Sequence, residues 1–158
     1  MKQPFNVLLS VVALFLVSIS GVAQDYHTAV GLRAGGPNGV TIKHFTKPKM
    51  AVEGIISSRW RGLGFTGLVE GHARFLGVKR LHFIYGAGGH IYFWGDSRRG
   101  YSPSGRSSVV GIDGILGLEY NFKEIPINLS LDWKPYANLH TDFGFWGDEG
   151  GISVRYMF

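Results

Sequence analysis

The sequence contains no cysteine among its 158 residues. A disulfide framework, a zinc–thiolate site and a thiol nucleophile are therefore excluded. Charged residues are also scarce, at 17% of the chain, against about 25% in soluble proteins. Intrinsic disorder is excluded as well, because disordered chains have few aromatic residues and this chain has 14%.

Long apolar runs are missing after residue 24, and none reaches 18 residues. A helical membrane span in residues 25–158 is therefore excluded, because such a span needs about 20 predominantly apolar residues. The apolar run 7–19 is too short for a span, and it follows a single cation, Lys2.

Small residues follow that apolar run, which completes the layout of a secretory signal peptide. We predict that residues 1–24 are a signal peptide that is cleaved during Sec-dependent export. Cleavage after Ala23 and cleavage after Gln24 fit equally well. Residues 25–158 are then predicted to form one domain.

Glycine is abundant, at 24 residues, and the mature chain alternates between apolar and polar residues at period two. Such alternation is typical of β-strands with two different faces. Eight segments show it, at residues 26–35, 39–45, 50–60, 65–75, 81–94, 111–122, 126–136 and 151–158. Ile115 breaks the pattern in its segment.

The connections between these segments differ in length. The connections at 46–49, 77–80 and 123–126 are short and charged, whereas those at 95–108 and 140–150 are long. In an up-and-down arrangement the short turns fall at one end with both termini. The long loops fall at the other end, with the turns at 35–39 and 61–64. This layout is typical of outer-membrane barrels.

The apolar face of the segments is rich in large aromatic side chains. An eight-stranded barrel has an interior just wide enough for its side chains. The large aromatic side chains of this face are too bulky to fit inside it. The aromatics near strand ends are typical of the girdles at membrane interfaces. They are Trp60, Phe93, Tyr120, Phe122, Trp133, Tyr156 and Phe158. We therefore expect the apolar face to contact lipid.

The polar face is predicted to form the barrel interior. It carries six cations and five anions, and unpaired buried charge is costly. These predicted interior charges are Arg33, Lys43, Glu53, Arg59, Glu70, Arg74, Asp113, Glu119, Asp132, Lys134 and Arg155. The opposite orientation, with the charges on a solvated surface, would make the chain a secreted soluble β-barrel that binds a small ligand.

The last segment alternates Ile152, Val154, Tyr156 and the terminal Phe158 on one face. In this respect the chain resembles the small eight-stranded outer-membrane β-barrel proteins of Gram-negative bacteria, such as OmpX and the OmpA transmembrane domain. The resemblance implies an all-β, eight-stranded antiparallel up-and-down transmembrane β-barrel in the outer membrane. It also implies that these four residues are the assembly signal recognised by the barrel assembly machinery.

Some barrels of this size modify lipid A, and we weighed that activity as an alternative. Deacylases of this type resemble one another in a His-x-Ser pair, and none of the six histidines here has Ser two positions on. His140 and Asp142, with the serines of 102–108, remain the weak candidate for a catalytic group.

No cofactor or metal is expected either. Acidic residues in the last long loop, Asp142, Asp148 and Glu149, lack the spacing of an EF-hand. The polar-face histidines His72, His82 and His90 are expected to form interior hydrogen bonds rather than a metal site.

The long loops carry residues that could bind lipopolysaccharide phosphates or a host surface. These surface-contact candidates are Arg98, Arg99, Tyr101, Arg106, Phe145 and Trp146. The pI is near 9.6, but nucleic acid is not an expected partner because the chain is predicted to be exported. The sequence therefore predicts a monomeric integral outer-membrane barrel with a structural or adhesion-like role, no catalysis and no wide pore.

Overall fold

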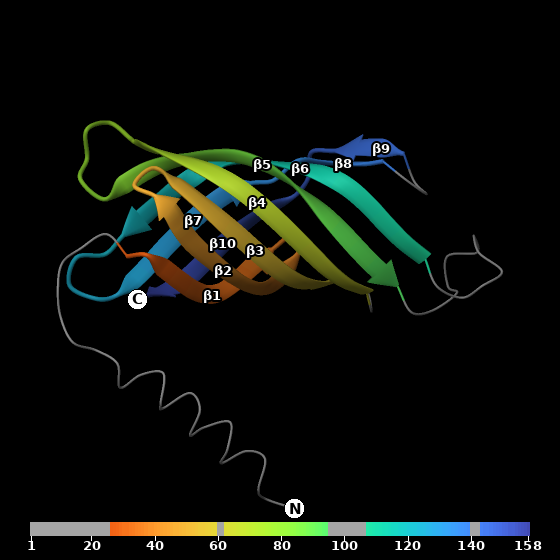
Figure 1. The fold of residues 1–158 in the computed structure, drawn as a ribbon, viewed down its shortest axis with the longest axis horizontal. Coiled ribbons are helices and arrows are strands. Elements are labelled where there is room, and N and C mark those ends of the chain that lie inside the picture. The colour runs from red at the N-terminus through yellow and green to blue at the C-terminus, as the bar shows by residue number, and fades with distance from the viewer. Residues whose placement is uncertain (1–25, 60–61, 95–106, 140–142) are drawn as a thin grey trace, which may run out of the picture.

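The computed structural model describes residues 26–59, 62–94, 107–139 and 143–158, and every regular element in them is a β-strand. In these ranges no helix is long and apolar enough to cross a membrane. The strands are β1 Thr28–Gly35, β2 Asn38–Lys47, β3 Met50–Arg59, β4 Gly62–Arg74, β5 Leu81–Trp94, β6 Ser107–Asn121, β7 Ile127–Trp133, β8 Tyr136–Asn138, β9 Gly144–Trp146 and β10 Gly150–Met157 (Figure 1).

Consecutive strands from β1 to β7 pair antiparallel, and β10 pairs with both β7 and β1, which closes the sheet. The result is an all-β, eight-stranded antiparallel up-and-down barrel, as predicted, with β7 and β8 sharing one position and β9 and β10 sharing the next. Both β7 and β8 pair with β6, and β9 pairs with β8.

The segment 140–150 is not one long loop, which corrects the sequence-based expectation. Pro135 interrupts the seventh strand because it lacks an N–H group. Its carbonyl nevertheless accepts a hydrogen bond from the Gly114 amide (2.8 Å), and the Leu139 amide donates to the Val110 carbonyl (2.9 Å). The chain therefore stays on β6 beyond Pro135 and returns as the hairpin of β8 and β9.

The strands are strongly staggered around the barrel. The register partners of Arg33 can be traced from strand to strand in both directions around the barrel. The path through β2, β3, β4 and β5 reaches Val109 in β6, whereas the path through β10 and β7 reaches Glu119 in the same strand. The two end points are ten residues apart in the sequence. A closed barrel needs such a stagger, which tilts its strands by about 35–45° from the axis.

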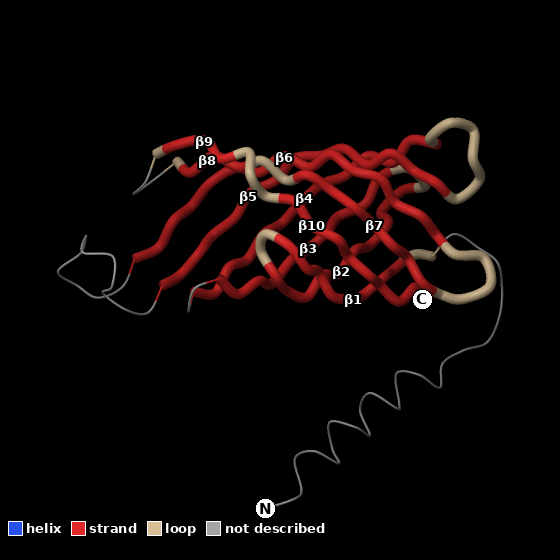
Figure 2. The backbone as a smooth tube through the Cα atoms, turned by 180° about the vertical axis from the view of Figure 1, so that it is seen from behind, coloured by secondary structure: helices blue, strands red, loops and turns tan. Residues whose placement is uncertain are grey.

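The two ends of the barrel differ. We call the end with residues 48–49, 75–80, 122–126 and Phe158 the turn end, and the opposite end the loop end. The C-terminus and these connections lie together in Figure 2, and β5, β6 and the β8–β9 hairpin extend furthest in the opposite direction. At the loop end, β1 passes to β2 through a tight turn in which the Gly35 amide donates to Asn38 Oδ1 (2.8 Å).

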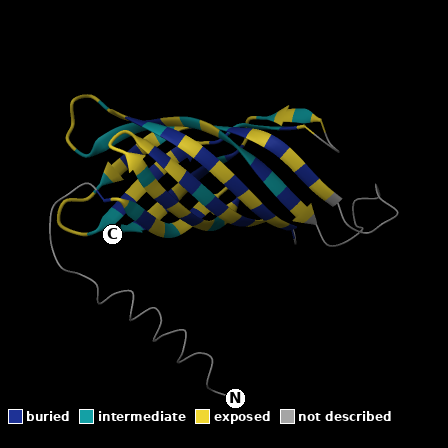
Figure 3. Ribbon diagram, viewed as in Figure 1, coloured by how far each residue is buried: buried dark blue, intermediate teal, exposed yellow. Residues whose placement is uncertain are grey.

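Burial alternates along every long strand (Figure 3), and its polarity is the reverse of that in a soluble barrel. Apolar side chains face outward, and they include Leu32, Val40, Ile42, Ile56, Phe65, Val69, Tyr85, Ile112, Leu131, Trp133, Ile152 and Val154. Charged and polar side chains fill the interior. An outward apolar belt over a polar lumen is the arrangement of transmembrane barrels.

A small apolar cluster interrupts the polar interior. Ile55, Leu68, Ile84 and Ile115 are each at most 2% exposed and pack together. They come from β3, β4, β5 and β6. Ile115 broke the predicted alternation because it faces inward beside its three partners.

Candidate functional site

The barrel interior is the candidate site, since nine of the eleven predicted interior charges are buried there. The nine are Arg33, Lys43, Glu53, Glu70, Asp113, Glu119, Asp132, Lys134 and Arg155. Arg74 is a correction, because its side chain is exposed. It is the last residue of β4, where the barrel wall ends and no opposite strand covers it. Arg59 ends β3, and its side chain lies outside the described part of the chain.

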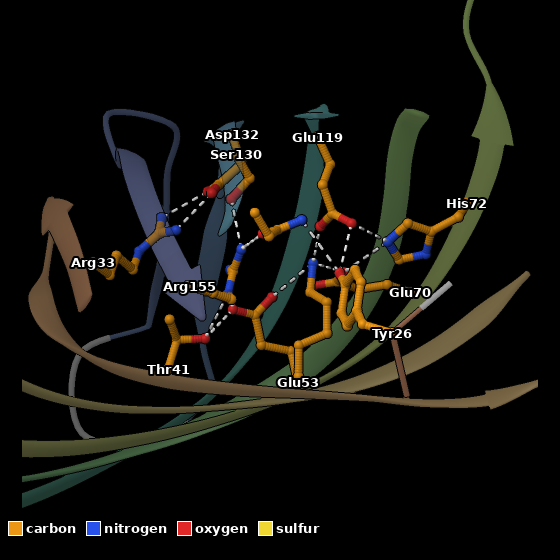
Figure 4. Close-up of polar contacts among 12 residues, drawn as sticks. Tyr26, Arg33, Thr41, Glu53, Glu70, His72, Glu119, Ser130, Asp132 and Arg155 are labelled. Carbon is orange, nitrogen blue, oxygen red and sulfur yellow. Dashed lines mark hydrogen bonds and ion pairs between the residues drawn. The ribbon is translucent and has the colours of Figure 1, made fainter. Parts of the chain in front are cut away.

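Lys43 in β2 is the centre of the first group of charges. Its Nζ lies 2.7 Å from Glu70 Oε2, 2.8 Å from Glu119 Oε2 and 3.4 Å from Glu53 Oε2. We call these four residues the Lys43 cluster (Figure 4). They are far apart in the sequence, on β2, β3, β4 and β6. The β2–β3 register brings Glu53 to Lys43, and the curvature of the barrel brings Glu70 and Glu119 from strands that do not pair with β2.

Arg155 in β10 joins the Lys43 cluster to the opposite wall. Its Nη2 lies 2.5 Å from Glu53 Oε1, and its Nη1 donates to Ser130 Oγ (2.8 Å) and to Asn128 Oδ1 (3.0 Å). Its Nε donates to Thr41 Oγ1 (3.3 Å). Four contacts from the three guanidinium nitrogens go to buried polar groups, which is how a fully buried arginine is tolerated.

Two further residues border the Lys43 cluster towards the turn end. Tyr26 donates from its hydroxyl to Glu119 Oε1 (2.8 Å) and is 7% exposed. His72 Nε2 lies 3.6 Å from Glu119 Oε1 and 3.9 Å from Glu70 Oε2. His72 was predicted to form interior hydrogen bonds, but these separations are longer than a normal hydrogen bond.

A bidentate pair lies beside Arg155. The two terminal nitrogens of Arg33 each donate to one oxygen of Asp132, both at 2.6 Å. Glycine at position 151 leaves the necessary room, because a Cβ there would lie 2.6 Å from the Arg33 guanidinium. The planar fork of arginine matches a carboxylate in this geometry.

The second group of charges surrounds Lys134, which follows β7. Lys134 Nζ lies 2.7 Å from Asp113 Oδ1 and 3.0 Å from Glu149 Oε2. His90 contacts the same aspartate, with Nδ1 2.8 Å from Asp113 Oδ2, and its Nε2 lies 3.0 Å from Asn138 Oδ1. We call these five residues the Lys134 cluster.

Sequence reasoning missed Glu149 and Asn138 as interior residues. Glu149 was placed in an acidic loop, yet it is 3% exposed. The cause is the bend at Lys134, whose amide donates to the Glu149 carbonyl (2.9 Å) and so draws residues 147–149 against the barrel. The signal that could have found Glu149 is its position directly before the alternating last segment.

The buried charges differ from the predicted set at two described positions, Arg74 and Glu149. Among the described buried side chains, four cations face six anions, because Glu149 joins the acids, Arg74 is exposed and the Arg59 side chain is not described. In the Lys43 cluster, three carboxylates and two cations, counting Arg155, leave one negative charge in excess. A buried excess charge is costly, and a proton bound within this network would reduce that cost.

The predicted assembly residues lie on the lipid-facing side of β10 and just after it. Ile152, Val154 and Phe158 are about half exposed, and the rings of Tyr156 and Phe158 are 5.0 Å apart. Phe158 also ties the barrel seam, because its amide donates to the Thr28 carbonyl (2.8 Å).

Most of the loop candidates cannot be placed. Arg98, Arg99, Tyr101 and Arg106 lie outside the described residues, as do His140 and Asp142. Phe145 is 71% exposed. Trp146 is instead stacked on Tyr136, with ring centroids 5.4 Å apart, so part of its surface is already covered. Within the described ranges no group of three or more His, Asp or Glu side chains could hold a metal ion.

Comparison with known proteins supports the fold and little else. No protein-family model matches the sequence, and no curated protein matches it. Among solved structures, the N-terminal β-barrel domain of Pseudomonas aeruginosa OprF is similar, with a TM-score of 0.59 and 17% sequence identity. The alignment covers 85% of this chain and all of that domain. The chain thus has the eight-stranded β-barrel fold of outer-membrane type, with its charges inside and its apolar side chains outside.

Proposed function

We propose that this protein is an integral outer-membrane barrel of a Gram-negative bacterium, with a structural or surface-interaction role and without catalysis. The observation that carries the proposal is the reversed polarity of the wall. Leu32, Ile112 and Leu131 are more than half exposed, while Lys43, Lys134 and Arg155 are at most 1% exposed. A lipid environment makes that arrangement favourable, because lipid covers the outward apolar side chains while the charges stay inside the barrel.

Biogenesis follows from the same proposal. Residues 1–24 would act as a cleaved signal peptide for Sec export. The outward face of the last strand, ending at Phe158, would then be recognised by the barrel assembly machinery. The turn end would face the periplasm, because short turns lie on that side of outer-membrane barrels. Lipid and lipopolysaccharide would surround a monomer.

The lack of catalysis is supported by the geometry of the described polar residues. His90 is the histidine best oriented by a carboxylate, through Asp113, but its second ring nitrogen is occupied by Asn138. A general base must keep that nitrogen free for a nucleophile or a water molecule. An adhesion-like role is supported by the exposed apolar side chains of Phe143 and Phe145 near the tip of the β8–β9 hairpin.

Fractionation tests the membrane assignment. The protein should remain in the outer-membrane fraction until detergent is added. It should also migrate differently on gels before and after boiling, since a hydrogen-bonded barrel resists the detergent until it is heated. Recovery in the periplasmic fraction without detergent would support the soluble ligand-binding barrel instead.

Lipid A mass spectra test the alternative enzymatic function. We expect identical spectra with and without expression of the protein. A changed spectrum that reverts in the His140→Ala variant would establish the lipid A-modifying activity and contradict the proposal.

A further inference from the structure

The turn end carries a concentration of positive charge. Among the described residues, six cationic side chains lie there and are exposed or partly exposed, against one acidic side chain, Glu124. The six are Lys47, Lys49, Arg74, Lys79, Arg80 and Lys123. A basic surface of this kind attracts anionic lipid headgroups when it lies next to a membrane.

Two of these cations border a cavity at the edge of the wall. The cavity has a volume of about 520 Å³ and is lined by Lys49, His72, Ala73, Arg74 and Tyr85. His72 is 5% exposed, and its Nδ1 has no hydrogen-bond partner. A buried polar nitrogen without a partner is unusual in a folded protein. Because His72 lines the cavity, a polar group bound there would lie next to this side chain.

An apolar hollow lies on the outer wall over β2, β3 and β4, and β4 also borders the cavity. The hollow has a volume of about 470 Å³, and its outward-facing lining includes Ile42, Val52, Gly54, Gly67 and Val69. Gly54 and Gly67 are register partners in β3 and β4, so the wall has no side chains at this point. A Cβ added at Gly67 would meet no atom within 4 Å. The hollow is therefore open space that an apolar chain can fill.

The cavity and the hollow are aligned along the strands at a spacing that suits a lipid. On β4 the cavity is lined by residues 72–74 and the hollow by residues 67–69, and their outward-facing members Ala73 and Gly67 are six residues apart. At about 3.3 Å per residue this is roughly 20 Å along the strand. With the strand tilt it becomes roughly 15 Å of depth, or half of a hydrocarbon core about 30 Å thick. A headgroup in the cavity would therefore place its acyl chain in the hollow.

We propose that this wall binds one anionic phospholipid of the inner leaflet, with its phosphate between Lys49 and Arg74 and one acyl chain over Gly54 and Gly67. This inference rests on the proposed function, because only a membrane barrel with its turn end at that leaflet meets such a lipid. A second copy of the chain is a poorer occupant. A symmetric neighbour on the same face would bring its own basic turn end against this one.

Native mass spectrometry of the barrel in mixed phosphatidylglycerol and phosphatidylcholine nanodiscs tests the site. The wild type should retain one phosphatidylglycerol molecule in preference to phosphatidylcholine with the same chains. Arg74→Gln should lower that preference roughly fivefold, from the usual contribution of one cation near an anionic lipid. Lys123→Gln removes one charge from another turn of the same end and should leave the preference unchanged.

The acyl-chain contact has its own pair of variants. Gly67→Leu places a side chain in the hollow, where an added Cβ meets no atom within 4 Å, and should lower retention of both lipids. Val154→Leu adds bulk to the lipid-facing side of β10 and should not. If Gly67→Leu retains lipid as the wild type does, or if Arg74→Gln and Lys123→Gln behave alike, the inference is wrong.

The two proposals fail in different ways. A wild-type barrel that inserts into nanodiscs and shows heat-modifiable mobility, yet shows no lipid preference, contradicts the lipid site alone. A chain that does not enter nanodiscs at all contradicts the proposed function. Binding of inorganic phosphate with no effect of Gly67→Leu would identify a phosphate site without an acyl-chain contact, and would also overturn the inference.

Discussion

Lys43 is the buried cation that contacts three buried carboxylates. Its ammonium contacts the carboxylates of Glu53, Glu70 and Glu119, and its side chain is fully buried. Such a network contributes little net stability when it is complete, because desolvation of the ions offsets their attraction. Removal of one partner, however, leaves the others buried without compensation.

Lys43→Met should therefore destabilise the folded barrel by about 3–5 kcal/mol. Lys47→Met is the matched control, because Lys47 lies in the same strand but is exposed, and it should change stability by no more than about 0.5 kcal/mol. Urea titration of both variants refolded in lipid vesicles measures the difference. Equal stability of the two variants would contradict the proposed importance of the Lys43 cluster.

A second substitution sharpens this test. Glu119→Gln removes one of the three carboxylates, so the double variant Lys43→Met/Glu119→Gln should recover part of the loss. Residues in one ion-pair network are expected to show such non-additive energies. Strict additivity would mean that Lys43 and Glu119 do not interact in the folded barrel.

Among the elements, β10 has two roles that can be separated. Its backbone closes the barrel against β1, and the chain continues this pairing at Phe158, whose carbonyl accepts from the His27 amide (3.2 Å). The outward side chains from Ile152 to Phe158 take no part in that ladder. Substitution of a side chain therefore leaves the seam intact, whereas deletion of Phe158 would remove seam hydrogen bonds as well.

Phe158→Ala should lower the amount of protein in the outer membrane severalfold, if the ring is part of an assembly signal. Unassisted folding of the purified chain into lipid vesicles should stay close to that of the wild type. Leu32→Ala, on the lipid-facing side of β1, serves as the control and should affect neither measurement. Normal outer-membrane levels of Phe158→Ala would contradict the assembly role of this ring.

The β7 and β8 pair shows where element prediction is limited. The eight alternating segments indicated eight strand positions, and the barrel has them. The hairpin of β8 and β9 was missed because residues 140–150 were predicted to form one long loop. Its backbone hydrogen bonds go to Gly114 and Val110 in β6, which are remote in the sequence. Non-local pairing of this kind leaves no periodic signal.

The whole molecule is a plugged cylinder rather than a channel. Arg155, Lys43 and Lys134 are among its largest fully buried side chains, and they extend across the interior from different walls. An eight-stranded barrel has room for such side chains and little else. A wide aqueous path is therefore not expected.

Liposomes that contain the purified protein should exclude a small sugar as well as empty liposomes do. A sixteen-stranded porin reconstituted in parallel provides the positive control, since barrels of that size leave an aqueous channel. Light scattering follows the swelling. Swelling at a rate near that of the porin would contradict the plugged interior.

The sequence by itself determined the architecture. Alternation at period two places neighbouring side chains on opposite faces of a strand. The number of segments, the unequal connections and the bulk of the apolar face then lead to an eight-stranded lipid-facing barrel. The same alternation assigns nine of the buried charges to the interior, because odd and even positions along a strand face opposite sides of the sheet.

Only the tertiary structure decided which charges meet. Arg33 meets Asp132, and Lys43 meets Glu70 and Glu119 as well as its register partner Glu53, because the stagger of the closed barrel sets which side chains of unpaired strands lie at the same height. The alternation of residues along one strand shows which face each side chain is on, but not how far neighbouring strands are shifted relative to one another. For the same reason the burial of Glu149 and the exposure of Arg74 followed from where each strand ends relative to its neighbours.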